Sequence, residues 1–389
     1  MNRVTVNLNA LQHNLQRIRE RMEHHGASWS VVTKALCGHT ETLRALHAMG
    51  VRSMADSRLD NLSAMAAALP DVERWYLRPP LLSAVREVVR LTDLSLNSEV
   101  EVIRALNREA LRQGKIHRII IMVELGDLRE GVLPGGLTRF FEAVHKLPNI
   151  ETVGIGAQVG CLSGIAPDRD QLDQLLLYRE LLELKFDCRL PLISAGSSIF
   201  LPALRDGIVP TAVNHYRIGE ALLLGTDLLH GGVLEGFRDD AFTIEAEVVE
   251  VREKSLVPSG TQVDSAPFDA LVDGAGDTHP SPGPQRGYRA LVALGQLDIE
   301  VSGLSPATDG FEIAGASSDI TAVNLGDDRG DLHLGDAIAF RPDYGALVRI
   351  MNNPSVAKQV CPSLQELQAA WADDGPDEMP AALELDWVA

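Results

Sequence analysis

One lysine in the sequence stands where an unprotonated amine could do chemistry. Lys34 directly follows Ser30–Thr33, a short run typical of a buried strand. A lysine at the end of such a strand is partly desolvated, which lowers the pKa of its ammonium group and frees a nucleophilic amine. The amine could then condense with an aldehyde. The alternative is a lysine that extends from the strand end into solvent, and position alone does not decide between the two.

Three further segments place polar and small residues at the ends of apolar runs: Glu124–Gly131, Ser194–Ser198 and Asn214–Glu220. Hydroxyl and backbone N–H groups beside glycines can surround a phosphate, and closed α/β barrels often place that site after their last two strands. A Ser-Ser pair alone is usually a turn, and a lone arginine is usually a surface charge. A lysine, a phosphate cradle, Arg129 and Arg217 together predict a site for pyridoxal 5′-phosphate (PLP).

The elements that would position these residues alternate between strand and helix. An opening strand (Val4–Leu8) and an amphipathic helix (Ala10–Glu23) precede eight apolar runs, which helical patterns separate. The runs are Ser30–Thr33, Ser53–Ala55, Trp75–Leu77, Leu94–Leu96, Ile119–Leu125, Gly154–Val159, Leu192–Ala195 and Tyr216–Leu223. Eight βα units predict a closed (β/α)8 barrel of the TIM type, with strand ends meeting at one mouth. An open doubly wound sheet is the alternative, but no GxGxxG motif follows the first strand, which disfavours its dinucleotide-binding form.

The pattern changes after residue 232 to strands without a convincing helix between them. These strands are Phe242–Val251, Arg289–Leu294, Phe311–Ile313, Ile320–Val323 and Ala337–Arg341. The predicted organisation is an α/β protein with a barrel over 1–232, an all-β domain over 233–362, and an acidic tail over 363–389 that contains a helix over Ser363–Trp371. The segment Lys254–Arg289 is rich in Pro, Gly and Asp, which predicts a functional or disordered loop.

The composition narrows the class of protein. Of 389 residues, 45% are hydrophobic and 23% are charged, as in an ordinary globular protein. The net charge of −19 disfavours nucleic-acid and anionic-membrane partners. No apolar run approaches the roughly 20 residues of a membrane span, and the first residues lack a signal-peptide core. Four scattered cysteines without a CxxC pair favour a reducing compartment and give no indication of zinc. We therefore expect a cytoplasmic protein without a metal.

Several blocks, in order, resemble the fold-type III PLP enzymes. The resemblance is to the alanine racemase group, and within it to the ornithine-racemase-like branch; it extends from about Val4 to Val356. The blocks are VVTKALCG, MADSRLDNL, LSLNSEVEVIRAL, IIIMVELGDLREG, GIGAQVGC, RIGEALLLG, ALGQLDI and GASSDI. The set is specific for the fold and the cofactor, and less specific for the substrate.

The resemblance implies roles for residues of the barrel. Lys34 looks like the lysine that forms a Schiff base with PLP, and Arg217 like the arginine that faces the pyridine nitrogen. Arg129 resembles the residue that contacts the phenolic oxygen of the cofactor or the substrate carboxylate. Gln158 stands where the broader group often has a histidine stacked on the ring. The implied phosphate cradle consists of Ser197, Ser198 and the backbone of Gly219 and Glu220.

Racemisation needs an acid–base group on each face of the reacting carbon. Lys34 is similar to the family base on one face, whereas the family tyrosine of the opposite base is replaced by Gln296, which does not titrate. We take Asp298 as the first candidate for this role, with Tyr344, also a candidate substrate contact, and Cys161 behind it. A structural turn acid is the alternative for Asp298. Asp319 is a candidate for binding a substrate amine.

Two departures from the ornithine branch affect the substrate and the second base. Ile320 stands where the branch usually has a histidine, and Ser355 stands where a tyrosine is expected. The function implied is racemisation of a free amino acid, possibly ornithine or another basic one, by a homodimer. Two alternatives stay open: a PLP-dependent lyase (retro-aldol or decarboxylation) on the same scaffold, and a PLP carrier without turnover.

Overall fold

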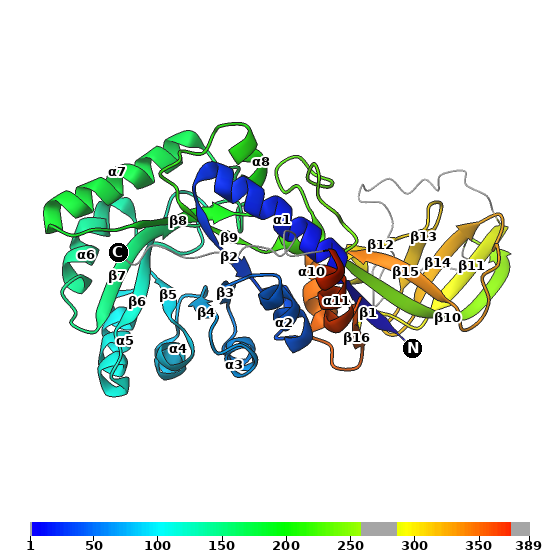
Figure 1. The fold of residues 1–389 in the computed structure, drawn as a ribbon. Helices are drawn as coiled ribbons and strands as arrows, with labels where there is room; N and C mark the ends of the chain where they lie inside the picture. Colours follow the sequence, from blue (N-terminus) through cyan, green and yellow to red (C-terminus); the bar gives the residue numbers. More distant parts are fainter. Residues whose placement is uncertain (1, 258–285, 375–389) are drawn as a thin grey trace. The chain divides into compact units, whose positions relative to one another are not determined.

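The computed structural model describes residues 2–257 and 286–374, which form two compact units (Figure 1). One unit contains Asn9–Arg238 together with the chain from Gln365, and the other joins Met1–Leu8 to Asp239–Leu364. The first unit is an α/β barrel and the second is built around an antiparallel sheet.

The barrel consists of eight strands, and its neighbours pair in parallel in the order β2 to β9, with β9 closing onto β2. The strands are β2 (Ser28–Val32), β3 (Ser53–Asp56), β4 (Glu73–Tyr76), β5 (Leu94–Asn97), β6 (His117–Val123), β7 (Ile150–Ala157), β8 (Leu192–Ser197) and β9 (His215–Ile218). Each lies within, or overlaps, one of the eight apolar runs. The predicted closed barrel is therefore confirmed, and the open doubly wound alternative is wrong.

One helix precedes the first barrel strand and the others follow the barrel strands, as the alternation predicts. They are α1 (Leu8–His25), α2 (Thr40–Ala48), α3 (Leu59–Ala68), α4 (Val85–Leu91), α5 (Val100–Gln113), α6 (Leu137–Val144), α7 (Arg169–Phe186), α8 (Phe200–Arg205) and α9 (Glu220–Leu224). The amphipathic pattern of α5 explains its place: Ile103, Leu106 and Ala110 recur at helical spacing and are all buried. Gly114 ends this helix in the left-handed conformation, at φ 65°.

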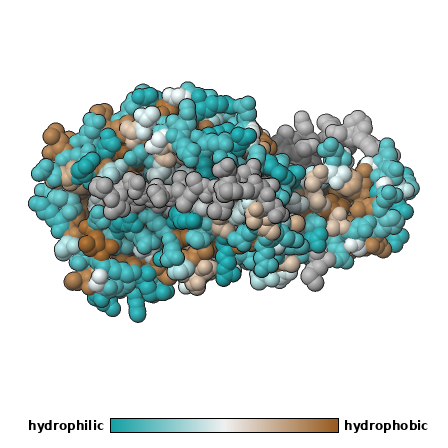
Figure 2. Space-filling model, viewed as in Figure 1, coloured by the Kyte–Doolittle hydropathy of each residue, from teal (hydrophilic) through white to brown (hydrophobic). Residues whose placement is uncertain are grey.

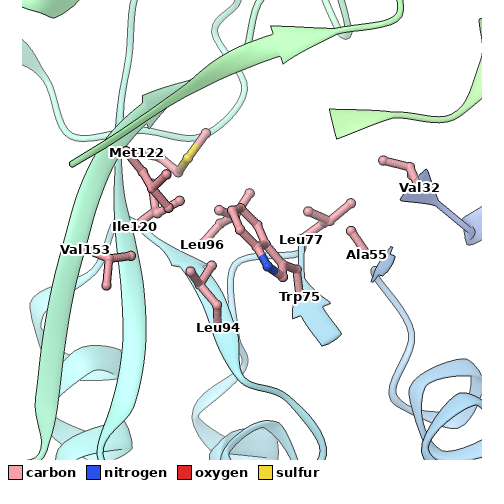
Figure 3. Close-up of a cluster of buried hydrophobic side chains, with 10 residues drawn as sticks. Val32, Ala55, Trp75, Leu77, Leu94, Leu96, Ile120, Met122 and Val153 are labelled. Carbon is pink, nitrogen blue, oxygen red and sulfur yellow. The ribbon is translucent and has the colours of Figure 1, made fainter. Parts of the chain in front are cut away.

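Apolar side chains from successive strands form the core of the barrel. Figure 3 shows ten of them, among them Val32, Trp75, Leu96 and Met122. Trp75 is 1% exposed, and its ring stacks on that of His215 with 4.2 Å between the centroids. A barrel interior filled in this way is a packed core, so chemistry is confined to the mouth at the strand ends.

Gly196 allows β8 to lie against the ring of Tyr216. A Cβ at this position would lie 1.8 Å from Cδ1 of the fully buried tyrosine. We therefore expect Gly196→Ala to lower the free energy of unfolding by about 2 kcal/mol, because the core would have to shift. Urea unfolding measures this. Gly135→Ala is the control, since an added Cβ there meets nothing within 4 Å; equal effects of the two substitutions would contradict the packing argument.

A second buried histidine makes stability depend on pH. His117, 2% exposed, contacts Ser95 Oγ through Nε2 at 2.8 Å, and burial lowers its pKa to about 4. Between pH 6.5 and 4 the unfolded chain binds a proton that the folded chain excludes, so stability falls as the pH falls through this window. His117→Gln should remove up to about 3 kcal/mol of this dependence. Urea titrations at pH 7 and pH 4 test this; an unchanged pH dependence would contradict it.

The second unit contains an eight-stranded sheet. Its main path runs β12 (Leu304–Pro306), β15 (Ala337–Pro342), β10 (Phe242–Ser255), β11 (Arg286–Val292), β14 (Thr321–Gly326) and β13 (Glu312–Ala316). These pairs are all antiparallel. The prediction of a β-domain is confirmed, and each of its five predicted strands overlaps an observed one.

Helix α10 and the strands β12 and β16 of this unit were not predicted. Helix α10 (Tyr344–Met351) begins after Asp343, whose Oδ1 accepts a hydrogen bond from Ala346 N at 2.7 Å. Asp343 is a standard N-cap, and the buried Leu347 and Ile350 form the apolar face of the helix. The short strand β16 spans Ala357–Cys361. The description of this domain as purely β was therefore incomplete.

The boundaries differ from the expected continuous ranges 1–232, 233–362 and 363–389. Strand β1 (Arg3–Asn7) pairs antiparallel with β10 and parallel with β16, so it belongs to the sheet and not to the barrel. Val4 and Val6 are fully buried and alternate with more exposed residues, as in a strand with one buried face. This alternation does not indicate which strands pair with β1. Helix α11 (Leu364–Asp374) packs on the barrel unit, where Trp371 Nε1 donates to Gln12 Oε1 at 3.1 Å.

Parts of the expected loop and tail, residues 258–285 and 375–389, lie outside the described residues. The face of the molecule in Figure 2 is largely hydrophilic with separate hydrophobic patches. In the described part of the chain, every helix is too short or too polar to cross a membrane.

Candidate active site

Lys34 lies at the end of β2, where it opens a short 3₁₀ helix, Lys34–Leu36. The residue is partly buried, and its amine makes no hydrogen bond or ion pair with any described residue. Burial lowers the pKa of Lys34, and the positive charges of Arg129 and Arg217 lower it further, against the opposing effects of Cys161 and Asp56. The amine is thus at the barrel mouth, near two arginines, and has no hydrogen-bond or ion-pair partner within residues 2–257 and 286–374.

Asp56 supports the backbone next to Lys34. It ends β3, is fully buried, and accepts hydrogen bonds from Thr33 Oγ1 at 2.9 Å and from Asn61 Nδ2 at 3.1 Å. Two following backbone N–H groups also donate to its Oδ1. Burial raises the pKa of this carboxyl group although these bonds favour the charged form. Sequence reasoning missed this residue; the signal was an acid at a strand end, in MADSRLDNL.

Arg217, 5% exposed, lies in β9 and is held by four hydrogen bonds. Its Nη1 donates to the carbonyl oxygen and Oγ of Ser194 at 2.5 and 2.6 Å, and its Nη2 donates to Ala157 O and Gln158 Oε1 at 3.0 and 3.1 Å. Nε has no partner among the described residues. Burial, with the charge of Arg129, lowers the pKa of Arg217 to about 10, so the guanidinium stays charged at neutral pH.

Gln158 follows β7 and is partly buried. Its amide oxygen accepts from Arg217, and its Nε2 donates to Val159 O at 3.4 Å. The structure therefore places this residue at the same strand ends as Arg217, and gives it a contact with the arginine that the sequence did not reveal.

Arg129 lies in the loop after β6. The loop is closed at its base, where Glu124 N donates to Val132 O at 3.1 Å and Val132 N donates to Met122 O at 2.8 Å. The guanidinium forms a two-pronged pair with Glu130, and its Nη1 lies 3.0 Å from Cys161 Sγ. Burial alone would lower the pKa of Arg129, but the bonds and charge of Glu130 raise it.

Asp127 joins this loop to the loop after β7. It is 1% exposed, and its carboxylate accepts hydrogen bonds from the backbone N–H groups of Cys161, Leu162 and Ser163 at 3.1–3.2 Å. Ser163 Oγ in turn donates to Asp127 O at 2.6 Å. Because Asp127 links the two loops by these hydrogen bonds, it fixes the position of Arg129 relative to Cys161. Sequence reasoning did not identify this residue, since nothing in its own segment names the partner loop.

The predicted phosphate cradle lies at the ends of β8 and β9. Ser198, 5% exposed, accepts at Oγ from Gly219 N at 3.3 Å and from Ala221 N at 3.2 Å. A Cβ at Gly219 would lie 3.0 Å from Val32 O, so glycine lets this backbone lie close to β2, which ends next to Lys34. Ser197 ends β8 and Glu220 begins α9; both are partly buried.

Three predicted site residues belong to the sheet unit. Asp298 accepts from Gly295 N at 3.2 Å and from Asn353 Nδ2 at 3.2 Å, which are contacts of a structural turn acid. Asp319 is exposed and accepts from Ser317 Oγ and Ser318 Oγ. Tyr344 is the partly buried first residue of α10. The structure thus brings together the barrel residues, and it places these three in a separate unit.

The barrel residues fit PLP by their chemistry. In the described part of the chain, the Lys34 amine has a lowered pKa and no partner, which suits an aldehyde, and the buried Arg217 leaves its Nε unused, which suits a ring nitrogen. The Ser198 hydroxyl at two strand ends suits a phosphate. Among the residues in 2–257 and 286–374, no three His, Cys, Asp or Glu side chains are grouped so that they could bind a metal ion.

The chain is similar over nearly its whole length to two curated proteins that are named racemases. It is 33% identical over 359 residues to an ornithine racemase of Acetoanaerobium sticklandii, covering 92% of this chain and 99% of that protein. It is 32% identical over 364 residues to a lysine racemase of Thermotoga maritima, covering 93% and 99%.

Solved structures with this fold include an alanine racemase from Streptomyces coelicolor A3(2), with a TM-score of 0.69 at 20% identity, covering 93% of this chain and 98% of that one. A D-threonine aldolase from Filomicrobium marinum has a TM-score of 0.67 at 15% identity, covering 90% and 88%. At these identities the likeness shows the fold alone. The family described as alanine racemase, N-terminal domain, matches residues 6–227, and the chain therefore belongs to the alanine racemase family, as its sequence motifs predict.

Proposed function

We propose that the protein is a PLP-dependent amino acid racemase in which Lys34 binds the cofactor and exchanges the proton at Cα. The observation that carries this proposal is the partly buried Lys34 amine at the barrel mouth, without a partner among the described residues and with a lowered pKa. The curated relatives that match across the chain are named racemases. The lyase and carrier alternatives have no comparable support, since the aldolase likeness concerns the fold only.

PLP, when bound, withdraws electrons from the Cα of an amino acid joined to it and so makes the Cα proton removable. Arg217 remains charged at neutral pH, so its Nε can donate to the ring nitrogen but cannot supply a proton permanently. Ser198 Oγ already accepts two N–H groups, which leaves its own hydrogen available for the phosphate. Ser197, Gly219 and Glu220 would complete this cradle, and Gln158, which accepts from Arg217, would help to hold the ring.

Lys34 would move a proton on one face of Cα, since its desolvated amine has a lowered pKa and is the group assigned to the cofactor. Arg129 orients the substrate carboxylate or the phenolic oxygen of the cofactor. In the structure its guanidinium donates to Glu130 and Cys161, so a substrate carboxylate would have to bind the guanidinium alongside these two partners. Asp127 fixes the position of the loop that carries it.

We assign the second acid–base role to Asp298, from the sheet unit of a second copy. Asp298→Asn should reduce racemisation by about 10²–10⁴-fold in both directions. Deuterium exchange at Cα of one enantiomer, catalysed from the Lys34 face, should persist. Asn353→Ala removes the neighbour of the carboxylate and tests whether local structure alone accounts for the loss. Full activity of Asp298→Asn would end this assignment and leave Tyr344 and Cys161, tested as Tyr344→Phe and Cys161→Ser.

A homodimer is the proposed assembly, with the sheet domain of one chain covering the barrel mouth of the other. Hydrophobic side chains project from loops after β4, β6 and β7, at the carboxyl ends of the strands. They are Leu81, Leu82, Leu128, Leu133 and Leu162, which are 56–74% exposed in the single chain. Covering them would also exclude water from the site. Sedimentation of the active enzyme tests this, and a fully active monomer would contradict it.

The proposed substrate is a free basic amino acid. The names of the two relatives, the net charge of −19 and the exposed carboxylate of Asp319 support a cationic side chain. Cys37, Cys161, Cys188 and Cys361 form no disulfide in the described part of the chain, which supports a cytoplasmic location. The test is to incubate the purified protein and PLP with each amino acid and separate the enantiomers on a chiral column. Release of an aldehyde or carbon dioxide instead of the other enantiomer would contradict the proposal.

A further inference from the structure

A series of hydrogen bonds between buried polar side chains runs through the barrel interior and ends at Arg217. Ser53 Oγ lies 2.7 Å from Ser30 Oγ, which lies 3.1 Å from His215 Nε2. On the other side of the ring, His215 Nδ1 lies 2.9 Å from Ser194 Oγ, which accepts from Arg217 Nη1 at 2.6 Å. The five residues come from β3, β2, β9 and β8, so the series links strands on both sides of the closure of the barrel.

His215 is the centre of this series and is held in a neutral state. It is 3% exposed, and its ring stacks on Trp75 at an interplanar angle of 10°. Burial, together with the charge of Arg217, holds the pKa of His215 well below its ordinary value. A neutral imidazole carries one N–H, so one nitrogen donates and the other accepts.

The hydrogen atoms of this series of hydrogen bonds can be assigned one after another, starting at Arg217. Arg217 Nη1 always donates, so Ser194 Oγ accepts from it and uses its own hydrogen elsewhere. Among the described residues, the acceptor within reach of that hydrogen is His215 Nδ1. The ring hydrogen is then on Nε2 and is donated to Ser30 Oγ, which donates to Ser53 Oγ. The opposite tautomer would leave the Ser194 hydrogen without an acceptor in a fully buried place.

We propose that His215 is a positioning residue for Arg217: by accepting the Ser194 hydrogen at Nδ1, it fixes the Ser194 hydroxyl that holds the guanidinium. The inference rests on the proposed function for its consequence, namely that Nε of Arg217 is aimed at the cofactor. A cation held by a long flexible side chain gains precision when each of its hydrogen-bond acceptors is itself fixed. The hydrogen bonds of the His215 ring in the described residues go to Ser30 and Ser194, so the ring acts on Arg217 through Ser194.

Two substitutions of His215 separate its two nitrogens. His215→Asn keeps an acceptor near the position of Nδ1 and loses the contact with Ser30. His215→Gln places its amide near the position of Nε2 and loses the contact with Ser194. Both remove the ring stacked on Trp75, so they are matched for lost packing. The readouts are the Kd for PLP, the urea midpoint without PLP, and the crystallographic position of the Arg217 guanidinium without PLP.

We expect His215→Gln to raise the Kd for PLP about tenfold and to displace the guanidinium, while His215→Asn stays within about threefold of the original protein and keeps it in place. Both variants should lose similar amounts of stability. Equal Kd values for the two variants, or an unmoved guanidinium in both, would overturn the proposal and leave His215 as packing. Failure of the original protein to bind PLP would instead refute the proposed function, and the guanidinium position would still test the positioning role.

Discussion

Replacing Lys34 with alanine is expected to reduce racemisation by at least about 10³-fold and to abolish the covalent attachment of PLP. The variant removes both the amine that condenses with the aldehyde and the base on one face of Cα. It should leave stability almost unchanged, because the Lys34 side chain has no hydrogen-bond partner among the described residues. Chiral chromatography of the reaction mixture measures the loss of racemisation. The loss of the Schiff base is measured as the loss of its absorption band, expected at roughly 400–430 nm.

Lys146→Ala is the matched control, since Lys146 is an exposed lysine between α6 and β7, away from the strand ends of the mouth. It should retain the activity and spectrum of the original protein. If Lys34→Ala keeps the absorption band, another amine holds the cofactor and the assignment of Lys34 is wrong. If it loses the band but keeps racemising, the Lys34 amine is not the required base and its assigned role in the proton transfer is wrong.

Replacing Arg217 with leucine is expected to lower the free energy of unfolding by about 3 kcal/mol or more, even without PLP. The substitution leaves the Ser194 oxygens, Ala157 O and Gln158 Oε1 in the barrel without their donor, and buried unsatisfied acceptors are costly. PLP affinity should fall as well, because the donor to the ring nitrogen is lost. Urea unfolding of the cofactor-free protein and a PLP titration separate the two effects.

Arg104→Leu is the comparison for this prediction. Arg104 lies on α5 in an exposed pair with Glu101, where surface ion pairs contribute little. Its loss should change stability by less than about 0.5 kcal/mol. An Arg217→Leu protein that unfolds at the same urea concentration as Arg104→Leu would show that the four hydrogen bonds do not hold the arginine as described.

The barrel could be predicted because its strands are short, apolar and regularly separated by helices. Ile119–Val123 is buried without interruption, and this is the pattern of a strand covered on both faces. Strand β1 illustrates the limit: its alternation was visible, but the choice of β10 and β16 as partners depends on contacts between remote segments. Helix α10 was missed although Asp343 supplied an N-cap, because the helix is short and follows a strand directly.

The position of a candidate residue could be predicted where its type coincides with a barrel strand or strand end, as for Lys34 and Arg217. It could not be predicted where it depends on a contact with a remote segment. Asp127 contacts a loop that begins more than thirty residues later, and His215 contacts serines on two other strands. The Asp298 role, suggested by resemblance alone, is still a prediction, since its observed contacts are local ones.

The pairing of β1 has a consequence for how the chain folds as it is synthesised. Arg3 pairs with Ala357, so the backbone groups of Arg3 on that side stay without this partner until the ribosome has reached Ala357. At about 5–20 residues per second, the wait lasts tens of seconds, during which the barrel segments can already assemble. An extension fused ahead of Arg3 should therefore slow completion of the sheet more than that of the barrel, and chaperones would find Val4 and Val6 still uncovered on the nascent chain.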